Sequence, residues 1–184
     1  PGAPIDTEDF FSLMKSGYGG GTLFVVSRTG VLFYSRDGGR TFDFQKLQFK
    51  SGSGSRNPRV QDMHVTDDGR VLILVNVGSR SGLLTRAAAA TEFRDWNYRP
   101  LDGIYRHIFA VNNIAEGARN IFQKGLYIAG KGRYLYSSDG ADWIGSFEER
   151  LEGSLVSITS MNARETGDMY FGGANGAFWI NANG

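Results

Sequence analysis

Two aspartates, Asp37 and Asp139, are the residues whose type and surroundings come closest to acid–base chemistry. Each lies two positions after a serine and is followed directly by glycine, and the two are 102 residues apart. Paired carboxylates can act as general acid and general base when they face one another across a substrate. Because the two aspartates lie in copies of one local sequence, we expect them at equivalent and separate places, and no catalytic pair is predicted.

Metal and phosphate chemistry has little support in the sequence. The chain has no cysteine, which excludes disulfides and thiolate metal sites. His64 and His107 each fall in an expected strand, with no second ligand at zinc-binding spacing. Residues 19–21 lack the Lys and Ser/Thr of a phosphate loop, and residues 67–70 lack the alternating oxygen ligands of a calcium loop. We therefore expect a plain β-turn at 67–70 and neither a metal nor a cofactor.

The turn that contains Asp37 recurs along the chain. Residues 35–42 read Ser-Arg-Asp-Gly-Gly-Arg-Thr-Phe, and residues 137–143 read Ser-Ser-Asp-Gly-Ala-Asp-Trp. Each copy follows a five-residue segment that begins with glycine, at 30–34 and at 132–136. A segment that returns in the same hydrophobic setting indicates a repeated supersecondary unit.

Two weaker copies bring the number of repeats to four. Residues 176–180 lead into an Asn-Ala-Asn-Gly turn, and residues 82–86 are followed by alanines in place of the turn. The equivalent aromatics Phe42, Trp96 and Trp143 are 54 and 47 residues apart, and a four-stranded sheet with its turns needs roughly forty residues. We expect one repeat domain over residues 1–184, with repeats at about 1–50, 58–102, 103–152 and 153–184.

Segments rich in β-branched and aromatic residues, separated by glycine or asparagine turns, predict the strands of each repeat. Helical patterning is weak except at residues 7–15, where a short helix capped by Thr7 and the first strand of the first repeat are equal alternatives. The Ser/Gly run at 51–55 is expected to be an unstructured tether. The expected strands lie at 22–26, 61–65, 71–75, 82–85, 96–98, 108–111, 125–129, 134–136, 143–147, 155–159, 168–173 and 177–180.

The fourth repeat has no expected outer strand, which would leave an open sheet edge. The chain is a piece of a longer protein, or an N-terminal segment supplies the closing strand, or a neighbouring subunit does. The first explanation is favoured, because the sequence begins at Pro1 and stops inside a turn. The predicted fold class is all-β: a β-propeller or partial propeller of about four four-stranded antiparallel blades, the last lacking its outer strand within this chain.

The pattern Ser-x-Asp-x-Gly-x-Thr-aromatic resembles the Asp-box, or BNR repeat, of sialidases and of many β-propellers that are not enzymes. Residues 35–42 match it with Phe42 in place of the usual Trp, residues 137–143 match a shortened variant, and residues 181–184 match it in outline. The resemblance covers the chain from about residue 20 to its end. It implies that the turn joins the third and fourth strands of a blade, away from the axial face where ligands usually bind.

The side chains of this turn are predicted to be structural. Asp and Ser accept hydrogen bonds from the backbone N–H groups of a tight turn, and the adjacent glycines allow positive φ. The aromatic residue is expected to fold back between strands and become buried. We expect no catalytic role for the residues of the two turns: Ser35, Asp37, Gly39, Thr41, Phe42, Ser137, Asp139, Gly140 and Trp143.

The alternative function is that of a fragment of a sialidase-like glycoside hydrolase. The resemblance implies that such an enzyme needs three arginines on the substrate carboxylate, a tyrosine nucleophile assisted by glutamate, and an acidic acid/base. Residues of these types lie in no motif that assigns them, and the family's site draws on six blades. The candidates are Arg28, Arg70, Tyr105, Arg106, Arg133 and Glu148.

Composition limits the class of partner. A chain of 184 residues with 41% hydrophobic residues is globular, and its net charge of +1, from 20 basic and 19 acidic residues, favours neither nucleic acid nor a membrane surface. No apolar run has the length of a membrane-spanning helix. The expected partner is therefore a protein, a neighbouring subunit or a glycan.

The preferred interpretation is a non-catalytic structural or binding propeller whose loops and blade edges contact such a partner. Tyr18, Tyr98 and Tyr105 are candidate exposed contacts. Two more specific roles stay open: a component of a virion or other assembly completed by strand addition, and an assembly chaperone resembling the photosystem assembly factors. The sequence does not fix the localisation; an extracellular or virion setting is favoured over the cytoplasm.

Overall fold

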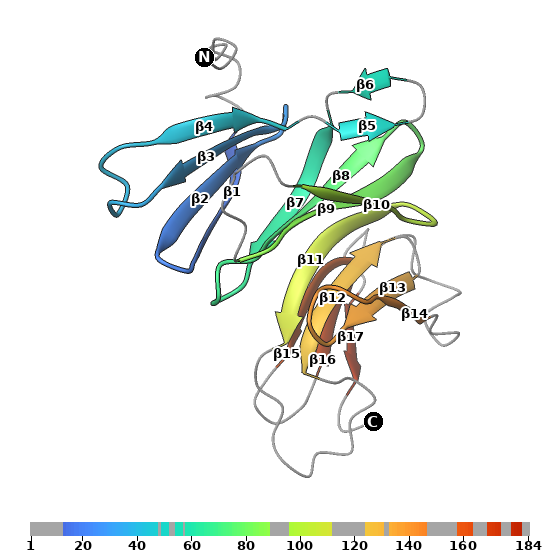
Figure 1. Ribbon diagram of the computed structural model, residues 1–184. Coiled ribbons are helices and arrows are strands. Elements are labelled where there is room, and N and C mark those ends of the chain that lie inside the picture. Colours follow the sequence, from blue (N-terminus) through green and yellow to red (C-terminus); the bar gives the residue numbers. More distant parts are fainter. Residues whose placement is uncertain are drawn as a thin grey trace. The chain divides into compact units, whose positions relative to one another are not determined.

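The computed structural model describes residues 13–47, 49–51, 54–56, 58–88, 96–111, 124–130, 133–146, 158–163, 169–173 and 178–181. Every regular element in these ranges is a β-strand, and the strands pair in antiparallel sheets, as Figure 1 shows. The chain divides into an N-terminal unit, Pro1–Gly103, and a C-terminal unit, Ile104–Gly184.

The N-terminal unit contains two four-stranded sheets in which consecutive strands pair in sequence order. Such antiparallel neighbours need only short turns between them. Sheet 1 consists of β1 (Leu13–Gly19), β2 (Thr22–Ser27), β3 (Val31–Ser35) and β4 (Asp43–Lys46). Sheet 2 consists of β7 (Arg59–Val65), β8 (Val71–Val77), β9 (Arg80–Arg86) and β10 (Asn97–Pro100).

The C-terminal unit has the same organisation. Sheet 3 consists of β11 (Tyr105–Val111), β12 (Gly125–Gly130), β13 (Arg133–Ser137) and β14 (Ile144–Ser146). Sheet 4 consists of β15 (Ile158–Ala163), β16 (Met169–Gly173) and β17 (Phe178–Asn181), and the described residues add no fourth strand to it. The predicted all-β class with four-stranded antiparallel sheets is confirmed.

Sheet 1 begins with a strand where the sequence allowed a helix. Leu13 to Lys15 lie in β1, which pairs with β2 through a bulge between Leu13 and Lys15, whereas Thr7 lies outside the described residues. Several strands extend beyond their predicted ends, as β7, β9 and β11 do with Arg59, Arg80 and Arg106. These three arginines are exposed, so they continue a strand without entering the core.

The expected tether at residues 51–55 is a hairpin instead. β5 (Phe49–Ser51) and β6 (Gly54–Arg56) form a two-stranded antiparallel ribbon in which Phe49 pairs with Arg56 and Ser51 with Gly54. The prediction of an unstructured tether is therefore wrong for these residues. Backbone pairing stabilises a ribbon that side-chain composition alone does not predict.

The core of the N-terminal unit lies between sheets 1 and 2. Residues 71–75 of β8 are all buried, as expected for a strand covered on both faces. Sheet 1 contributes side chains that alternate along β2 and β3, and Leu47 follows β4. The buried cluster consists of Phe24, Val26, Leu32, Leu47, Val60, Met63, Val65, Val71, Ile73, Val75 and Leu84.

Two turns at one end of the sheets pack directly on each other. The N–H of Gly20, in the β1–β2 turn, donates to the carbonyl of Asp67, in the β7–β8 turn, at 3.0 Å. Within the second turn, the N–H of Gly69 donates to the carbonyl of Thr66 at 2.8 Å, so a β-turn is present as expected, over residues 66–69, one position before the predicted 67–70. A Cβ atom on Gly19 would clash with the Thr66 carbonyl oxygen. Backbone contact without side chains thus fixes sheet 1 against sheet 2 at this end.

We predict that Gly19→Ala lowers the free energy of unfolding by more than about 2 kcal/mol, because the new methyl group would force the two turns apart. Gly21→Ala is the matched control in the same turn. Gly21 has φ of 74° and open space around its Cα, so it should cost only about 1 kcal/mol of conformational strain. Urea unfolding followed by tryptophan fluorescence measures both values, and equal losses would contradict the packing of the two turns.

Candidate functional site

The turn between β3 and β4 is held by Ser35 and Asp37. Asp37 Oδ1 accepts the backbone N–H groups of Arg40 and Thr41, each at 3.0 Å, and Oδ2 accepts the Thr41 hydroxyl at 2.6 Å. Ser35 Oγ donates to Asp37 Oδ1 at 2.7 Å and accepts the N–H of Gly39 at 2.8 Å. Gly39 has φ of 89°, which only glycine adopts freely. Both oxygens of the Asp37 carboxylate are therefore engaged within their own turn.

The turn between β13 and β14 repeats this arrangement with one residue fewer. Ser137 Oγ accepts the N–H of Gly140 at 2.7 Å and donates to Asp139 Oδ1 at 3.2 Å. Asp139 Oδ1 also accepts the N–H of Ala141 at 2.8 Å. The indole N–H of Trp143 donates to the carbonyl of Gly140 at 3.3 Å. As in the first turn, the serine and aspartate side chains accept hydrogen bonds from backbone N–H groups a few residues further along the chain.

The aromatic residues of the two turns differ in burial. Trp143 is 8% exposed, whereas Phe42 is 44% exposed, so the expected burial of the aromatic is wrong for Phe42. Its ring lies over Gly39, where an added Cβ would be 3.8 Å from Phe42 Cζ. Unlike Trp143, Phe42 has no N–H group that could bond to the turn, and the turn that carries it is longer. Phe42 therefore remains at the surface of sheet 1.

Hydrogen bonds to the charged carboxylate keep the pKa of Asp37 well below its ordinary value. The Thr41 hydroxyl contributes most, followed by the Thr41 N–H and the Ser35 hydroxyl. A depressed carboxyl pKa stabilises the fold above the pKa of the unfolded chain, and that stabilisation is lost as the pH falls through the folded value. Acidification should therefore loosen this turn.

We predict that Thr41→Val raises the pKa of Asp37, because the strongest hydrogen bond to its carboxylate disappears while the shape of residue 41 is kept. Thr41→Ser retains the hydroxyl and is the matched control, with a pKa close to that of the unchanged chain. Titration of the Asp37 carboxyl by NMR measures the three values. An unchanged pKa in Thr41→Val would show that the backbone N–H groups alone hold the charge.

The first strands of sheets 1 and 2 carry an ion pair that the sequence did not reveal. Lys15 Nζ, on β1, lies 2.8 Å from Asp62 Oδ1, on β7. The Lys15 side chain is 45% exposed and that of Asp62 only 5%, so the charge of a buried carboxylate is balanced at the surface. Asp62 Oδ1 also accepts the N–H of Met63 at 2.8 Å. The signal available in the sequence is a single carboxylate among the apolar Val60, Met63 and Val65 of β7, which indicates that the carboxylate needs a cation without naming it.

His64 lies two residues along β7 from Asp62 and is half-buried. Burial lowers the pKa of His64 below its ordinary value, and the Lys15 charge lowers it further, whereas Asp62 and Asp67 act in the opposite direction. Protonation of His64 therefore opposes folding. The corresponding stability is complete above the pKa of an unfolded histidine and decreases as the pH falls through the lower folded value.

We predict that Lys15→Met raises the pKa of His64, because it removes a repulsive charge and leaves the Asp62 carboxylate unneutralised. Asp62→Asn should change the same pKa in the opposite direction, since the attractive charge is lost. Histidine ring signals followed by NMR across the acidic range give both values. Shifts of the same sign in the two variants would show that the pKa responds to a change in burial and not to these charges.

The residues considered for a hydrolase do not form a cluster in the N-terminal unit. Arg28, in the β2–β3 turn, accepts through its carbonyl the N–H of Val60 at the start of β7, whereas Arg70 follows the other end of β7. The two arginines therefore lie at opposite ends of that strand. Tyr105 is buried, so the expectation that it is an exposed contact is wrong.

The other predicted residues have separate settings. Arg106 is exposed on β11, Arg133 begins β13, and Glu148 lies outside the described residues. Tyr18 is exposed, and Tyr98 is half-buried against the core. Within the described ranges, no three His, Cys, Asp or Glu side chains are grouped so that they could hold a metal ion, and no helix is suited to spanning a membrane.

The sequence matches no protein-family model and no curated protein. Among solved structures, it is similar to a protein described as YCF48 bound to a D1 peptide, with a TM-score of 0.62 and 15% identity. That match covers 94% of this chain and 50% of the other, so the chain spans about half the length of this neighbour. A protein from Lactobacillus plantarum matches with a TM-score of 0.46 and 9% identity, over 88% of this chain and 53% of the other.

The YCF48 structure is a β-propeller. This chain has the fold of a β-propeller or of part of one. At 15% identity the similarity concerns the fold alone. The surfaces that could bind a partner must therefore be inferred from this chain's own residues.

Proposed function

We propose that this chain is a non-catalytic binding module that holds an acidic segment of a protein partner over β1 and β7, the first strands of the two sheets in its N-terminal unit. The same proposal assigns the Ser and Asp residues of the two polar turns a structural role, within one repeat domain with the four repeats expected from the sequence. The observation that carries the proposal is the polarity of the first strand β7 beside the apolar second strand β8.

The contrast between first and second strands supports this surface. Residues 71–75 of β8 are buried, whereas β7 carries the exposed Arg59 and the half-buried Gln61 and His64. Polar side chains that the packing of a strand does not require are candidates for binding a partner.

The charge of the first strands favours an acidic partner. The sequences of β1 and β7 contain the basic residues Lys15 and Arg59 and a single carboxylate, that of Asp62. Since Lys15 is paired with Asp62, the charge of Arg59 is in excess. Excess charge of one sign steers a ligand of the other sign and selects against its opposite.

The structural neighbour adds independent support for a peptide ligand. YCF48 is described as bound to a D1 peptide, so a propeller of this kind can hold a peptide. The carboxylates that would be needed for acid–base catalysis are engaged elsewhere: Asp37 and Asp139 accept hydrogen bonds within their own turns. A binding role therefore fits these residues better than hydrolysis does.

The proposal predicts that a random-peptide library displayed on phage yields acidic peptides that bind the chain. Arg59→Glu should raise the dissociation constant of a selected peptide by at least about tenfold, since it reverses an exposed charge. Fluorescence anisotropy with a labelled peptide measures the effect. Arg80→Glu is the matched control, an exposed arginine at the start of the third strand β9, and should leave binding unchanged.

Two results would refute the proposal. One is a library selection that yields no acidic binder, and the other is equal weakening by Arg80→Glu. Turnover of a fluorogenic sialoside that single arginine substitutions abolish would instead favour the sialidase-like hydrolase.

A further inference from the structure

Sheet 1 is apolar on both of its faces. Its forward face carries Phe24, Val26 and Leu32 and packs into the core with sheet 2. Side chains alternate between faces along a strand, so Leu23, Val25 and Phe33 lie on the opposite, rear face. A sheet with one face in water normally shows polar residues there. The rear face of sheet 1 therefore has the composition of a covered surface.

The cross-strand register identifies a row of paired residues in sheet 2 that is equivalent to a row on the rear face of sheet 1. Leu84 pairs with Ile73 on one side and with Tyr98 on the other, and all members of this row belong to or pack on the core. The covered row of sheet 2 is Met63, Ile73, Leu84 and Tyr98. The corresponding rear row of sheet 1 is Ser16, Val25, Phe33 and Phe44. In sheet 2 this row lies under the forward face of a neighbouring four-stranded sheet, sheet 1.

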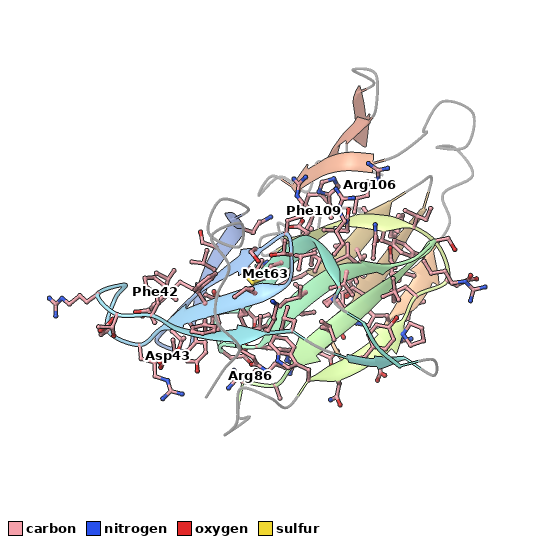
Figure 2. All side chains as sticks on the ribbon, turned by 90° about the horizontal axis from the view of Figure 1, so that it is seen from above. Phe42, Asp43, Met63, Arg86, Arg106 and Phe109 are labelled. Carbon is pink, nitrogen blue, oxygen red and sulfur yellow. The ribbon has the colours of Figure 1, made fainter. Side chains whose placement is uncertain are left out.

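Among the described residues of the N-terminal unit no further sheet lies on the rear row of sheet 1; its central member Phe33 is 6% exposed, whereas its outer members are exposed. Phe44 is 36% exposed above Phe33, with the two rings 6.4 Å apart, and Tyr18 is 65% exposed beside Leu23. Phe42 extends the same face, because its ring and the Leu23 side chain both approach Gly39. Figure 2 shows Phe42 toward the tip of sheet 1, away from the interior position of Met63. We call this surface, Tyr18, Leu23, Phe42 and Phe44, the rear patch.

We propose that the rear patch is an interface that binds a sheet of a second copy of this chain. The patch spans β1 to β4 and is as broad as a sheet, so it fits another sheet better than a single extended peptide. The contact between sheets 1 and 2 shows what covers such a row: the forward face of a sheet built from the same repeat. A second copy provides such sheets.

Sheet 4 of the second copy is the candidate occupant. Its register places Tyr170 opposite Ile180, the pairing that Phe24 and Tyr34 make in sheet 1. The net charge of +1 provides little repulsion between copies. An apolar patch with aromatic anchors and little charge is typical of contacts between subunits.

The proposal predicts that the chain dimerises through the rear patch. Sedimentation equilibrium should give a mass rising with concentration from 20.2 kDa to about twice that value. Phe44→Asp and Phe42→Ser should each weaken the dimer at least about tenfold, because an exposed aromatic anchor is lost. Ile144→Asp, at another exposed apolar residue, is the matched control and should leave the dimer intact.

A labelling experiment provides a second measurement that does not depend on a charged substitution. Because the chain has no cysteine, Phe42→Cys and Ile144→Cys can each carry a single environment-sensitive dye. Addition of unlabelled chain should change the fluorescence at position 42 and not at position 144. Binding of the selected acidic peptide should persist in Phe44→Asp, which separates this interface from the proposed peptide surface.

A mass of 20.2 kDa at every concentration would overturn the proposal, whether the rear patch is then free or covered by sheet 4 of the same chain. A dimer that survives both Phe44→Asp and Phe42→Ser with its circular dichroism spectrum unchanged would overturn it as well. Equal fluorescence changes at positions 42 and 144 would show that the contact is not confined to the rear patch.

Discussion

Burial of both faces of a β-sheet is the constraint on which the N-terminal unit depends. Residues 71–75 of β8 are apolar without interruption and are all buried, which requires a cover on each side of sheet 2. Sheet 1 provides one cover, since Phe24 and Val26 belong to the same buried cluster as Val71 and Ile73. Because sheet 1 also carries apolar side chains on its other face, the same constraint applies to that face. Stacking of sheets is therefore what stabilises this unit.

The polar residues divide between two tasks. In the β3–β4 and β13–β14 turns, serine and aspartate satisfy backbone N–H groups that the strands cannot, and this occupies the carboxylates most suited to catalysis. On the first strands, Lys15 balances the buried charge of Asp62, while Arg59 and Arg106 are exposed at positions that packing does not require. For this reason we place the proposed peptide surface on the first strands and not in the repeated turns.

Local signals predicted the elements, and contacts between distant residues were beyond them. Recurrence of the Asp37 turn predicted where β3 ends and β4 begins, because its hydrogen bonds join residues at most four positions apart. The Lys15–Asp62 pair joins residues on two sheets, and no local pattern identifies it. The burial of Tyr105 and the exposure of Phe42 were predicted wrongly for the same reason, since each depends on what packs over the side chain.

The sequence by itself determined the all-β class, the repeat, the polar turns and the uninterrupted apolar runs of β2 and β3, because propensity and periodicity act over a few neighbouring residues. Only the tertiary structure decided which face of sheet 1 meets sheet 2, which cation neutralises Asp62, and which aromatics remain exposed. These outcomes depend on the cross-strand register and on the packing of one sheet on another, which bring together residues far apart along the chain.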